Sequence, residues 1–182
     1  MRGPHIETSR LLLRPLELED VSQAYVDWLN DPRVNQFLET RHRVQTLESC
    51  VDFVAKSNDS ACEHLFGVFS GQTGKHIGNA KLGQVNHEHG RGQISLVIGE
   101  REEWGKGLGR EIVQALTCYG FRDLGLERLE AGCYDSNLAS LRTFLSVGYV
   151  VEGFFRSHVM AGDRRRRGCF WMGILPHEFK PA

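Results

Sequence analysis

Three alternating glycines, Gly105, Gly107 and Gly109, stand between an apolar segment and an amphipathic one. The apolar segment at 94–99 predicts a strand, and the apolar spacing over 108–119 predicts a helix that begins inside the glycine turn. A strand, a glycine-rich turn and a helix N-terminus in direct succession aim several backbone N–H groups and the positive end of a helix dipole at one point. The sequence therefore predicts an anion-binding site, and phosphate is the anion that suits it.

The glycine spacing differs from the two common nucleotide-binding motifs. It is G-x-G-x-G, not G-x-G-x-x-G. A dinucleotide-binding fold also needs an acidic residue at the end of the next strand, whereas Glu127 and Glu130 fall at the start of the next predicted strand. A P-loop requires Gly-Lys-Ser/Thr, whereas Lys106 is followed by Gly107. Glycines that serve only the geometry of a tight turn are the structural alternative. Their position directly before a strong amphipathic helix argues against that alternative.

Strands and helices that would position this turn follow from the apolar periodicity. Helices are expected over 21–29, 47–54 and 108–119, and between 137 and Gly148. Adjacent central strands suggest antiparallel meanders, and the strand–helix–strand unit at 94–134 suggests one parallel crossing. We therefore expect an α/β (α+β) fold with a mixed, mostly antiparallel sheet of about seven strands and about four helices on its faces. The predicted strands are 11–16, 64–70, 76–85, 93–98, 128–134, 149–156 and 168–174.

Cap residues mark the ends of these helices. Asp20 and Thr46 are placed to cap the first two, and residues 135–137 precede the last one. Gly148 lies just past the end of that last helix, where a left-handed residue often closes the helix. The polar residues 33–45 predict an irregular loop on the substrate side of the molecule.

Composition bounds the class of protein. The chain has 182 residues, of which 41% are hydrophobic and 25% charged, as expected for one globular domain over 1–182. A net charge of −1 argues against direct nucleic-acid binding, and no apolar run approaches the length that crosses a membrane. The N-terminal residues lack the apolar core of a signal peptide, so we expect a cytoplasmic protein. Five scattered cysteines predict reduced thiols and no metal site: Cys50, Cys62, Cys118, Cys133 and Cys169.

Residues 93–150 resemble the core of the GNAT superfamily, the acetyl-CoA-dependent N-acetyltransferases. The family signature Q/R-x-x-G-x-G/A falls on 104–109, with Trp104 in place of Gln or Arg. That departure is usual in a branch that resembles the ribosomal-protein N-terminal acetyltransferases. The resemblance extends over about 9–174, and its further matches are 10–16, 28–32, Asn137-x-x-Ser140, 148–149 and 152–156.

The resemblance implies a GNAT fold with acetyl-CoA as co-substrate and no metal. The pyrophosphate would lie on the amides of 105–109, with added charge from Lys106 and Arg110, although both could equally be solvated cations. The strand at 96–98 would pair with the pantetheine amides, and one of its backbone N–H groups would hold the thioester oxygen. The cofactor-binding residues implied are Leu96, Val97, Ile98, Trp104, Gly105, Lys106, Gly107, Leu108, Gly109, Arg110, Asn137 and Phe144.

Catalysis needs a neutral amine and a proton for the departing thiolate. With a pKa near ~10.4, only about one lysine-like amine in a thousand is neutral near pH 7, so a base is expected. Glu100, which follows the strand, is the candidate base. Many family members protonate the thiolate with a tyrosine seven residues after the helix asparagine; that position here is Phe144, and the resemblance assigns the role to Ser140. The alternatives for the base are Glu102, Glu103, Asp135, His64, His89 and His158.

The acceptor implied by this branch is a protein N-terminal amine. An amino sugar on a nucleotide, or another small amine such as a polyamine or an antibiotic, is the alternative. A non-catalytic acyl-CoA sensor on the same fold is a hypothesis of another class, and Phe144 supports it. The arginine run at 164–167 predicts a basic hairpin turn or a docking patch for an acidic partner. The resemblance also implies a possible homodimer.

Overall fold

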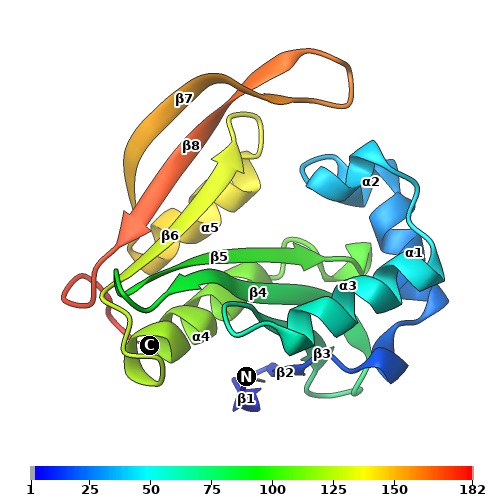
Figure 1. Ribbon diagram of the computed structural model, residues 1–182, viewed down its shortest axis with the longest axis horizontal. Helices are drawn as coiled ribbons and strands as arrows, with labels where there is room; N and C mark the ends of the chain where they lie inside the picture. Colours follow the sequence, from blue (N-terminus) through cyan, green and yellow to red (C-terminus); the bar gives the residue numbers. More distant parts are fainter. Residues whose placement is uncertain (1–2, 182) are drawn as a thin grey trace.

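One eight-stranded sheet runs through the computed structural model, which describes residues 3–181 (Figure 1). Its order is β1-β2-β3-β4-β5-β6-β8-β7, and all neighbours are antiparallel except β5 and β6. The mixed, mostly antiparallel sheet confirms the predicted fold class. The strands are β1 (Ile6–Glu7), β2 (Leu11–Pro15), β3 (His64–Ser70), β4 (His76–Asn86), β5 (Arg91–Ile98), β6 (Arg128–Tyr134), β7 (Val150–Met160) and β8 (Arg166–Ile174).

Helices cover both faces of this sheet (Figure 1). None of those in 3–181 is both long and apolar enough to cross a bilayer. The α-helices are α1 (Gln23–Asn30), α2 (Pro32–Asn35), α3 (Leu47–Asp59), α4 (Leu108–Arg122) and α5 (Leu138–Val147), and the 3-10 helices are η1 (Leu18–Asp20), η2 (Glu39–His42) and η3 (Arg101–Glu103).

Two apolar clusters hold the layers together. The larger one packs α4 and α5 on one face, with Leu82, Leu116 and Leu129 fully buried in it. The second packs α1 and α3 on the other face around Leu16 and Val54. Burial of such a side chain contributes about 1.5–3 kcal/mol, so each face of the sheet is a separate source of stability.

Residues 3–181 form one strand and one α-helix more than the sequence predicted. The additional strand, β1, pairs with β2. It is two residues long, which is too short to give a periodic signal in the sequence. The stretch 33–45, expected to be irregular, contains most of α2 and all of η2. α2 begins because Asp31 accepts a hydrogen bond from the Arg33 N–H at 2.8 Å and Pro32 stands at a first-turn position, where its missing N–H costs nothing.

The predicted cap of α1 is wrong in residue, and the predicted cap of α3 is confirmed. Ser22, and not Asp20, caps α1 by accepting from the Tyr25 N–H at 3.4 Å. Asp20 instead ends η1 and pairs with both terminal nitrogens of Arg14 at 2.7 Å. Thr46 caps α3 as predicted.

The start of α5 is capped from within the predicted residues 135–137. Asn137 is its N-cap, and its Oδ1 accepts from the Ser140 N–H at 3.2 Å. Asp135 accepts from the Gly168 N–H at 2.7 Å, so it joins the end of β6 to β8 and does not cap the helix. Gly148 closes α5 in the left-handed region at φ 111°, as predicted.

Candidate active site

β5 and β6 are paired at only one end. Residues 91–93 pair with 128–130 in parallel, after which β5 continues beside β4 and β6 beside β8. The two strands diverge toward their C-terminal ends, and α4 and α5 follow them (Figure 1). The sheet therefore contains a gap between neighbours, which is the place where an extended ligand could add itself as a strand.

The backbone of β5 alternates between its partner β4 and this gap. The Gly99 N–H donates to the Ile77 carbonyl at 2.9 Å, so Gly99 faces β4. By the antiparallel alternation, Val97 also faces β4, opposite Asn79, whereas Leu96 and Ile98 face the gap. Of the three residues that the sequence assigned to the cofactor arm, two thus present backbone groups there. Val97 does not, because sequence periodicity gives no pairing direction.

Trp104 closes the far end of the gap. Its indole Nε1–H donates to the Ile98 carbonyl at 2.7 Å, while the ring stays 42% exposed. This bond leaves the Leu96 peptide groups and the Ile98 N–H as the free backbone groups of the gap edge. A ring held at this place can also pack on a ligand that leaves the gap toward α4.

The glycine turn leads directly into α4, as predicted. Gly105 and Gly107 adopt left-handed conformations with φ 75° and 80°, which glycine reaches without steric cost. Gly107 is the N-cap of α4, and Leu108 is buried beneath the turn. No side chain caps the helix, so the N–H groups of its first turn remain available to an anion. Of the two cations predicted near it, Lys106 pairs with Glu103 at 3.0 Å and Arg110 is exposed.

The gap is flanked on its other side by the start of α5. Ser140 is in the first turn of that helix, near enough to the Cys133 thiol of β6 to lower the pKa of that thiol. Burial raises the pKa of that thiol to about 11. Asn137 holds the Ser140 N–H, so the hydroxyl and the helix start are fixed together beside the gap.

Phe144 lies in the core. Its ring is 2% exposed and meets Tyr149 edge-to-face, with centroids 5.0 Å apart. The predicted cofactor contact therefore has no exposed ring surface to make it, and the residue acts as packing beneath α5. Sequence spacing placed it on the correct helix but could not show how deep it lies.

Glu100 lies at the end of β5 with both oxygens engaged. One accepts from the Trp28 indole N–H at 3.2 Å, and the other pairs with the Lys75 ammonium at 2.7 Å. Among the other predicted bases, His64 is buried and hydrogen-bonds the Tyr119 hydroxyl at 3.1 Å, and burial lowers its pKa. His89 lies in the turn before β5, at the opposite end of the strand from Glu100.

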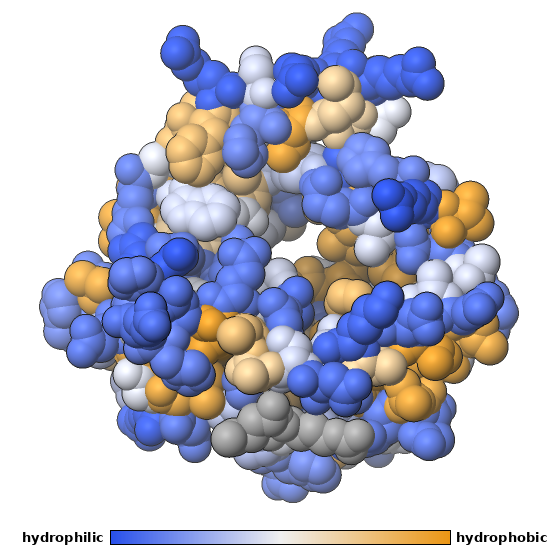
Figure 2. Space-filling view, viewed as in Figure 1, coloured by the Kyte–Doolittle hydropathy of each residue, from blue (hydrophilic) through white to orange (hydrophobic). Residues whose placement is uncertain are grey.

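A cavity of about 420 Å³ lies on the other face of the sheet, against β4 and β5. Its walls come from α1, η2 and α3, and its lining includes Leu29, Phe53 and Val97. Among residues 3–181, Glu39 and Lys81 are the charged residues that line it, and Lys81 is paired with Glu63 at 2.6 Å. Figure 2 shows hydrophilic residues around a hollow whose floor is apolar, beneath the β7–β8 hairpin. The stretch 33–45, expected on the substrate side, contributes part of this lining, but sequence reasoning could not assemble the cavity because its other walls come from α1, α3, β3, β4 and β5.

Asn79 carries an unpaired donor buried beside this cavity. The residue lines the cavity and is 5% exposed, and its Nδ2 has no hydrogen-bond partner among residues 3–181. The amide orientation follows from His76, whose Nε2 lies 2.9 Å from both the Gly78 carbonyl and the Asn79 Oδ1. Because the carbonyl can only accept, Nε2 carries the proton and the Asn79 atom facing it is the oxygen. The nitrogen is therefore the unsatisfied atom.

The hairpin tip is tied down beside the cavity. Arg41 of η2 donates to the Met160 carbonyl of β7 and to the Tyr134 hydroxyl at 2.7 Å. Tyr134 in turn donates to Glu39, and burial, with the bond to Glu39, raises its pKa to about 12. The arginine run 164–167 begins in the predicted basic hairpin turn and continues into the first two residues of β8, where Arg167 pairs with Asp163 at 3.0 Å.

Comparison with known proteins agrees with this geometry. The family model for the acetyltransferase (GNAT) domain matches residues 10–150. An uncharacterized N-acetyltransferase, p20, from Bacillus licheniformis is 32% identical over 160 residues, which cover 86% of this chain and 88% of that protein. The spermidine N-acetyltransferase from Vibrio cholerae, solved with CoA and spermine, superposes with a TM-score of 0.84 at 22% identity, over 94% of this chain and 98% of that one.

A protein from Vibrio cholerae proposed to be a ribosomal-protein-serine acetyltransferase superposes with a TM-score of 0.73 at 23% identity, over 94% of this chain and 97% of that one. The family match covers the glycine turn, the diverging strands and the start of α5 in a single alignment. The chain therefore belongs to the GNAT family and is an N-acetyltransferase.

Proposed function

We propose that this enzyme transfers the acetyl group of acetyl-CoA to a primary amine by direct attack in a ternary complex. The observation that carries the proposal is the gap between β5 and β6, with the glycine turn at its end and the apolar cavity on the opposite face. A thioester lying in the gap is within reach of an amine that enters from the cavity. No sheet backbone separates the two, because β6 has diverged from β5 at that level.

The cofactor is held at three places along this path. The amides of 105–109 and the start of α4 bind the pyrophosphate, with Lys106 and Arg110 adding charge. The Leu96 peptide groups and the Ile98 N–H pair with the pantetheine amides, and Asn137 contacts the arm from α5. An N–H of this strand edge also donates to the thioester oxygen as negative charge develops there, which typically lowers the barrier by a few kcal/mol.

Ser140 is the donor that protonates the departing thiolate. It lies in the first turn of α5 beside the gap, with its backbone fixed by Asn137. A thiol pKa near ~8.5 makes the thiolate a good leaving group at neutral pH, so a weak donor is sufficient. Ser140→Ala should lower turnover and leave the affinity for CoA unchanged. Full turnover in this variant would remove Ser140 from the mechanism.

Glu100 is the candidate base, and its two contacts make the role testable. Glu100→Gln keeps an acceptor for the Trp28 indole and removes the charge that Lys75 pairs with. If Glu100 is the base, the Glu100→Gln variant should have a lower turnover, and its pH profile should lack the acidic limb. If the variant keeps both, Glu100 only anchors the end of β5 on α1.

The acceptor is the α-amine of a protein N-terminus. The cavity has one carboxylate, Glu39, which already accepts from Tyr134, so a polyamine would find few counter-ions for its remaining ammonium groups. An α-amine has a pKa of about 7.7–8.0, which leaves a few hundred times more of it neutral at pH 7 than of an amine with a pKa near ~10.4. The Asn79 amide, unpaired and buried beside the cavity, can turn toward the carbonyl that follows an α-amine in a peptide and donate to it.

Release of the CoA thiol with a panel of amines tests this function. The panel holds a ribosomal-protein N-terminal peptide, the same peptide with a blocked α-amine, spermidine and an amino-sugar nucleotide. We expect turnover with the free peptide and none with its blocked form. Turnover with spermidine or the amino sugar alone would assign a small-amine acceptor, and tight CoA binding without any turnover would indicate an acyl-CoA sensor.

A further inference from the structure

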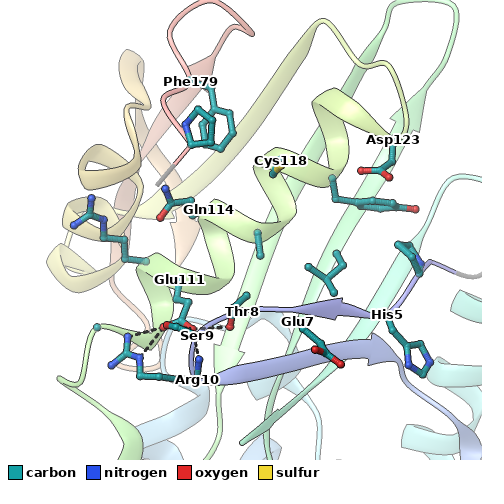
Figure 3. A pocket seen from close by; sticks show the side chains of 17 residues that line it. His5, Glu7, Thr8, Ser9, Arg10, Glu111, Gln114, Cys118, Asp123 and Phe179 are labelled. Atoms are coloured by element: carbon teal, nitrogen blue, oxygen red, sulfur yellow. Dashed lines mark hydrogen bonds and ion pairs between the residues drawn. The ribbon is translucent and has the colours of Figure 1, made fainter. Parts of the chain in front are cut away.

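Glu111, in the first turn of α4, is the centre of a cluster of hydrogen bonds that the mechanism above does not use. It accepts from the Thr8 hydroxyl at 2.6 Å, the Arg10 N–H at 2.9 Å and the Arg10 Nε–H at 2.7 Å. Hydrogen bonds from these partners, taken together with the Arg10 charge, lower the pKa of Glu111 against the opposing effect of its burial. The segment before β2 is therefore bound to the start of the helix (Figure 3).

Arg10 uses a different nitrogen to hold the glycine turn itself. Its Nη1 donates to the Lys106 carbonyl at 2.7 Å, while Nη2 pairs with Glu111 at 2.6 Å. Arg10 and Glu111 line a groove of about 830 Å³ between the N-terminal segment and α4. The guanidinium thus bridges the helix and the carbonyl that stands between Gly105 and Gly107.

The direction of that carbonyl fixes the direction of an amide. The peptide between Lys106 and Gly107 is trans, so its C=O and its N–H point opposite ways. With the carbonyl drawn toward Arg10, the Gly107 N–H points away from Arg10. Rotation of this peptide changes ψ of Lys106 and φ of Gly107, and Gly107 has no Cβ to oppose the change. A rotated peptide would present a carbonyl oxygen to a bound phosphate where an N–H is needed.

We infer that Arg10 is a positioning residue for the cofactor: held by Glu111, it fixes the Lys106 carbonyl so that the Gly107 N–H is available to the pyrophosphate. The inference rests on the proposed use of acetyl-CoA at this turn. Arg10 does this through the turn and not as a phosphate ligand, because its charge is already paired with Glu111. A lysine at position 10 would keep the charge but could not hold Glu111 and the carbonyl with the same planar fork.

The test compares a cofactor that has the pyrophosphate with one that lacks it. Arg10→Ala, Arg10→Lys and Glu111→Gln are assayed with acetyl-CoA and with S-acetylpantetheine, on an amine that the wild-type enzyme acetylates. Arg122→Ala, an exposed arginine at the end of the same helix, is the matched control. CoA affinity is measured separately by calorimetry, and folding by thermal unfolding.

We expect the two Arg10 variants to raise the KM for acetyl-CoA and the Kd for CoA about tenfold, the size of one hydrogen bond to a charged group. Their kcat, and their kcat/KM for S-acetylpantetheine, should stay at the wild-type level, and Glu111→Gln should shift the Kd in the same direction. Equal losses on both cofactors would assign Arg10 to the fold alone, and wild-type behaviour of Arg10→Lys would assign it to charge; either result overturns the inference. A wild-type enzyme that does not bind CoA would instead refute the proposed function.

Discussion

Replacing Asn79 by leucine should leave the protein as stable as before, or more stable, while weakening its hold on the acceptor. Asparagine is an unexpected residue at a site 5% exposed, because its Nδ2 is left without a partner there. Stability alone does not explain such a group. The proposed function does, since the amide is then reserved for the acceptor.

The magnitude follows from the bonds that are lost and gained. A buried donor without a partner costs about 1–3 kcal/mol, and leucine removes that cost at similar volume. The change also removes the acceptor of one His76 hydrogen bond, worth about 1 kcal/mol, but His76 keeps its second bond to the Gly78 carbonyl at 2.9 Å. The free energy of unfolding should therefore change by about 0 to +2 kcal/mol. The KM of the acceptor should rise about tenfold, the loss of one hydrogen bond of about 1.4 kcal/mol.

Urea unfolding and steady-state kinetics with both substrates measure these effects. Thr117→Val is the matched control, because Thr117 is also buried but is fully paired, at 2.7 Å with the Val113 carbonyl and at 3.0 Å with the Tyr149 hydroxyl. That control should lose about 1–2 kcal/mol of stability, because it leaves Tyr149 unpaired, without changing either KM.

Two results would refute the reasoning about Asn79. A loss of stability as large as that of the Thr117 control would mean that the Asn79 amide is satisfied in the folded protein. An unchanged KM for the acceptor, with stability kept, would mean that the amide serves neither the fold nor the substrate. The KM for acetyl-CoA should not move in either case, since Asn79 lines the cavity on the opposite face from α4.

Three further outcomes follow from single contacts. Trp104→Phe removes the bond to the Ile98 carbonyl and should raise the KM for acetyl-CoA severalfold with little change in melting temperature. Gly99→Ala should destabilise the fold by about 1–3 kcal/mol, read as a lower urea midpoint, because an added Cβ would overlap the Trp28 indole. Glu111 has a lowered pKa in the folded protein, so its contribution to stability is present above its usual pKa of about 4.3 and is lost as the pH falls below it. Unfolding curves between neutral and acidic pH should show that Glu111→Gln flattens this loss; an equally steep loss in the variant would rule out Glu111 as its source.

The part of the site that the sequence predicted is the part carried by neighbouring residues. The strand at 94–98, the turn and α4 form one continuous segment, so strand periodicity, glycine spacing and helix periodicity each constrain the next. The same local logic gave Thr46 and Gly148 as helix ends. It failed at α1, where Asp20 and Ser22 are both good caps two positions apart and only the preceding 3-10 turn decides between them.

The rest of the site depends on contacts between distant segments. Arg10 and Glu111 are 101 positions apart, and nothing in either neighbourhood marks them as partners. The cavity proposed for the acceptor is lined by residues of α1, η2, α3, β3, β4 and β5, and nothing in the sequence distinguishes Asn79 from an ordinary strand residue. Phe144 shows the same dependence on distant contacts. The motif predicted its position on α5, but its burial depends on packing against Tyr149, which the motif does not describe.

The chemistry around the gap favours direct attack over an acyl-enzyme. Cys133, at the end of β6 beside Ser140, is the nearest candidate for a covalent nucleophile. Burial raises its pKa to about 11. A thiol with such a pKa is ionised in only about one molecule in ten thousand at pH 7, and the thiolate is the form that attacks. A group that is buried and protonated cannot take the acetyl ahead of an amine arriving from the opposite face. In the proposed function the pleat of β5 brings the two substrates together there, since Leu96 and Ile98 pack toward α4 while Val97 lines the cavity on the other face, which Leu96 also borders.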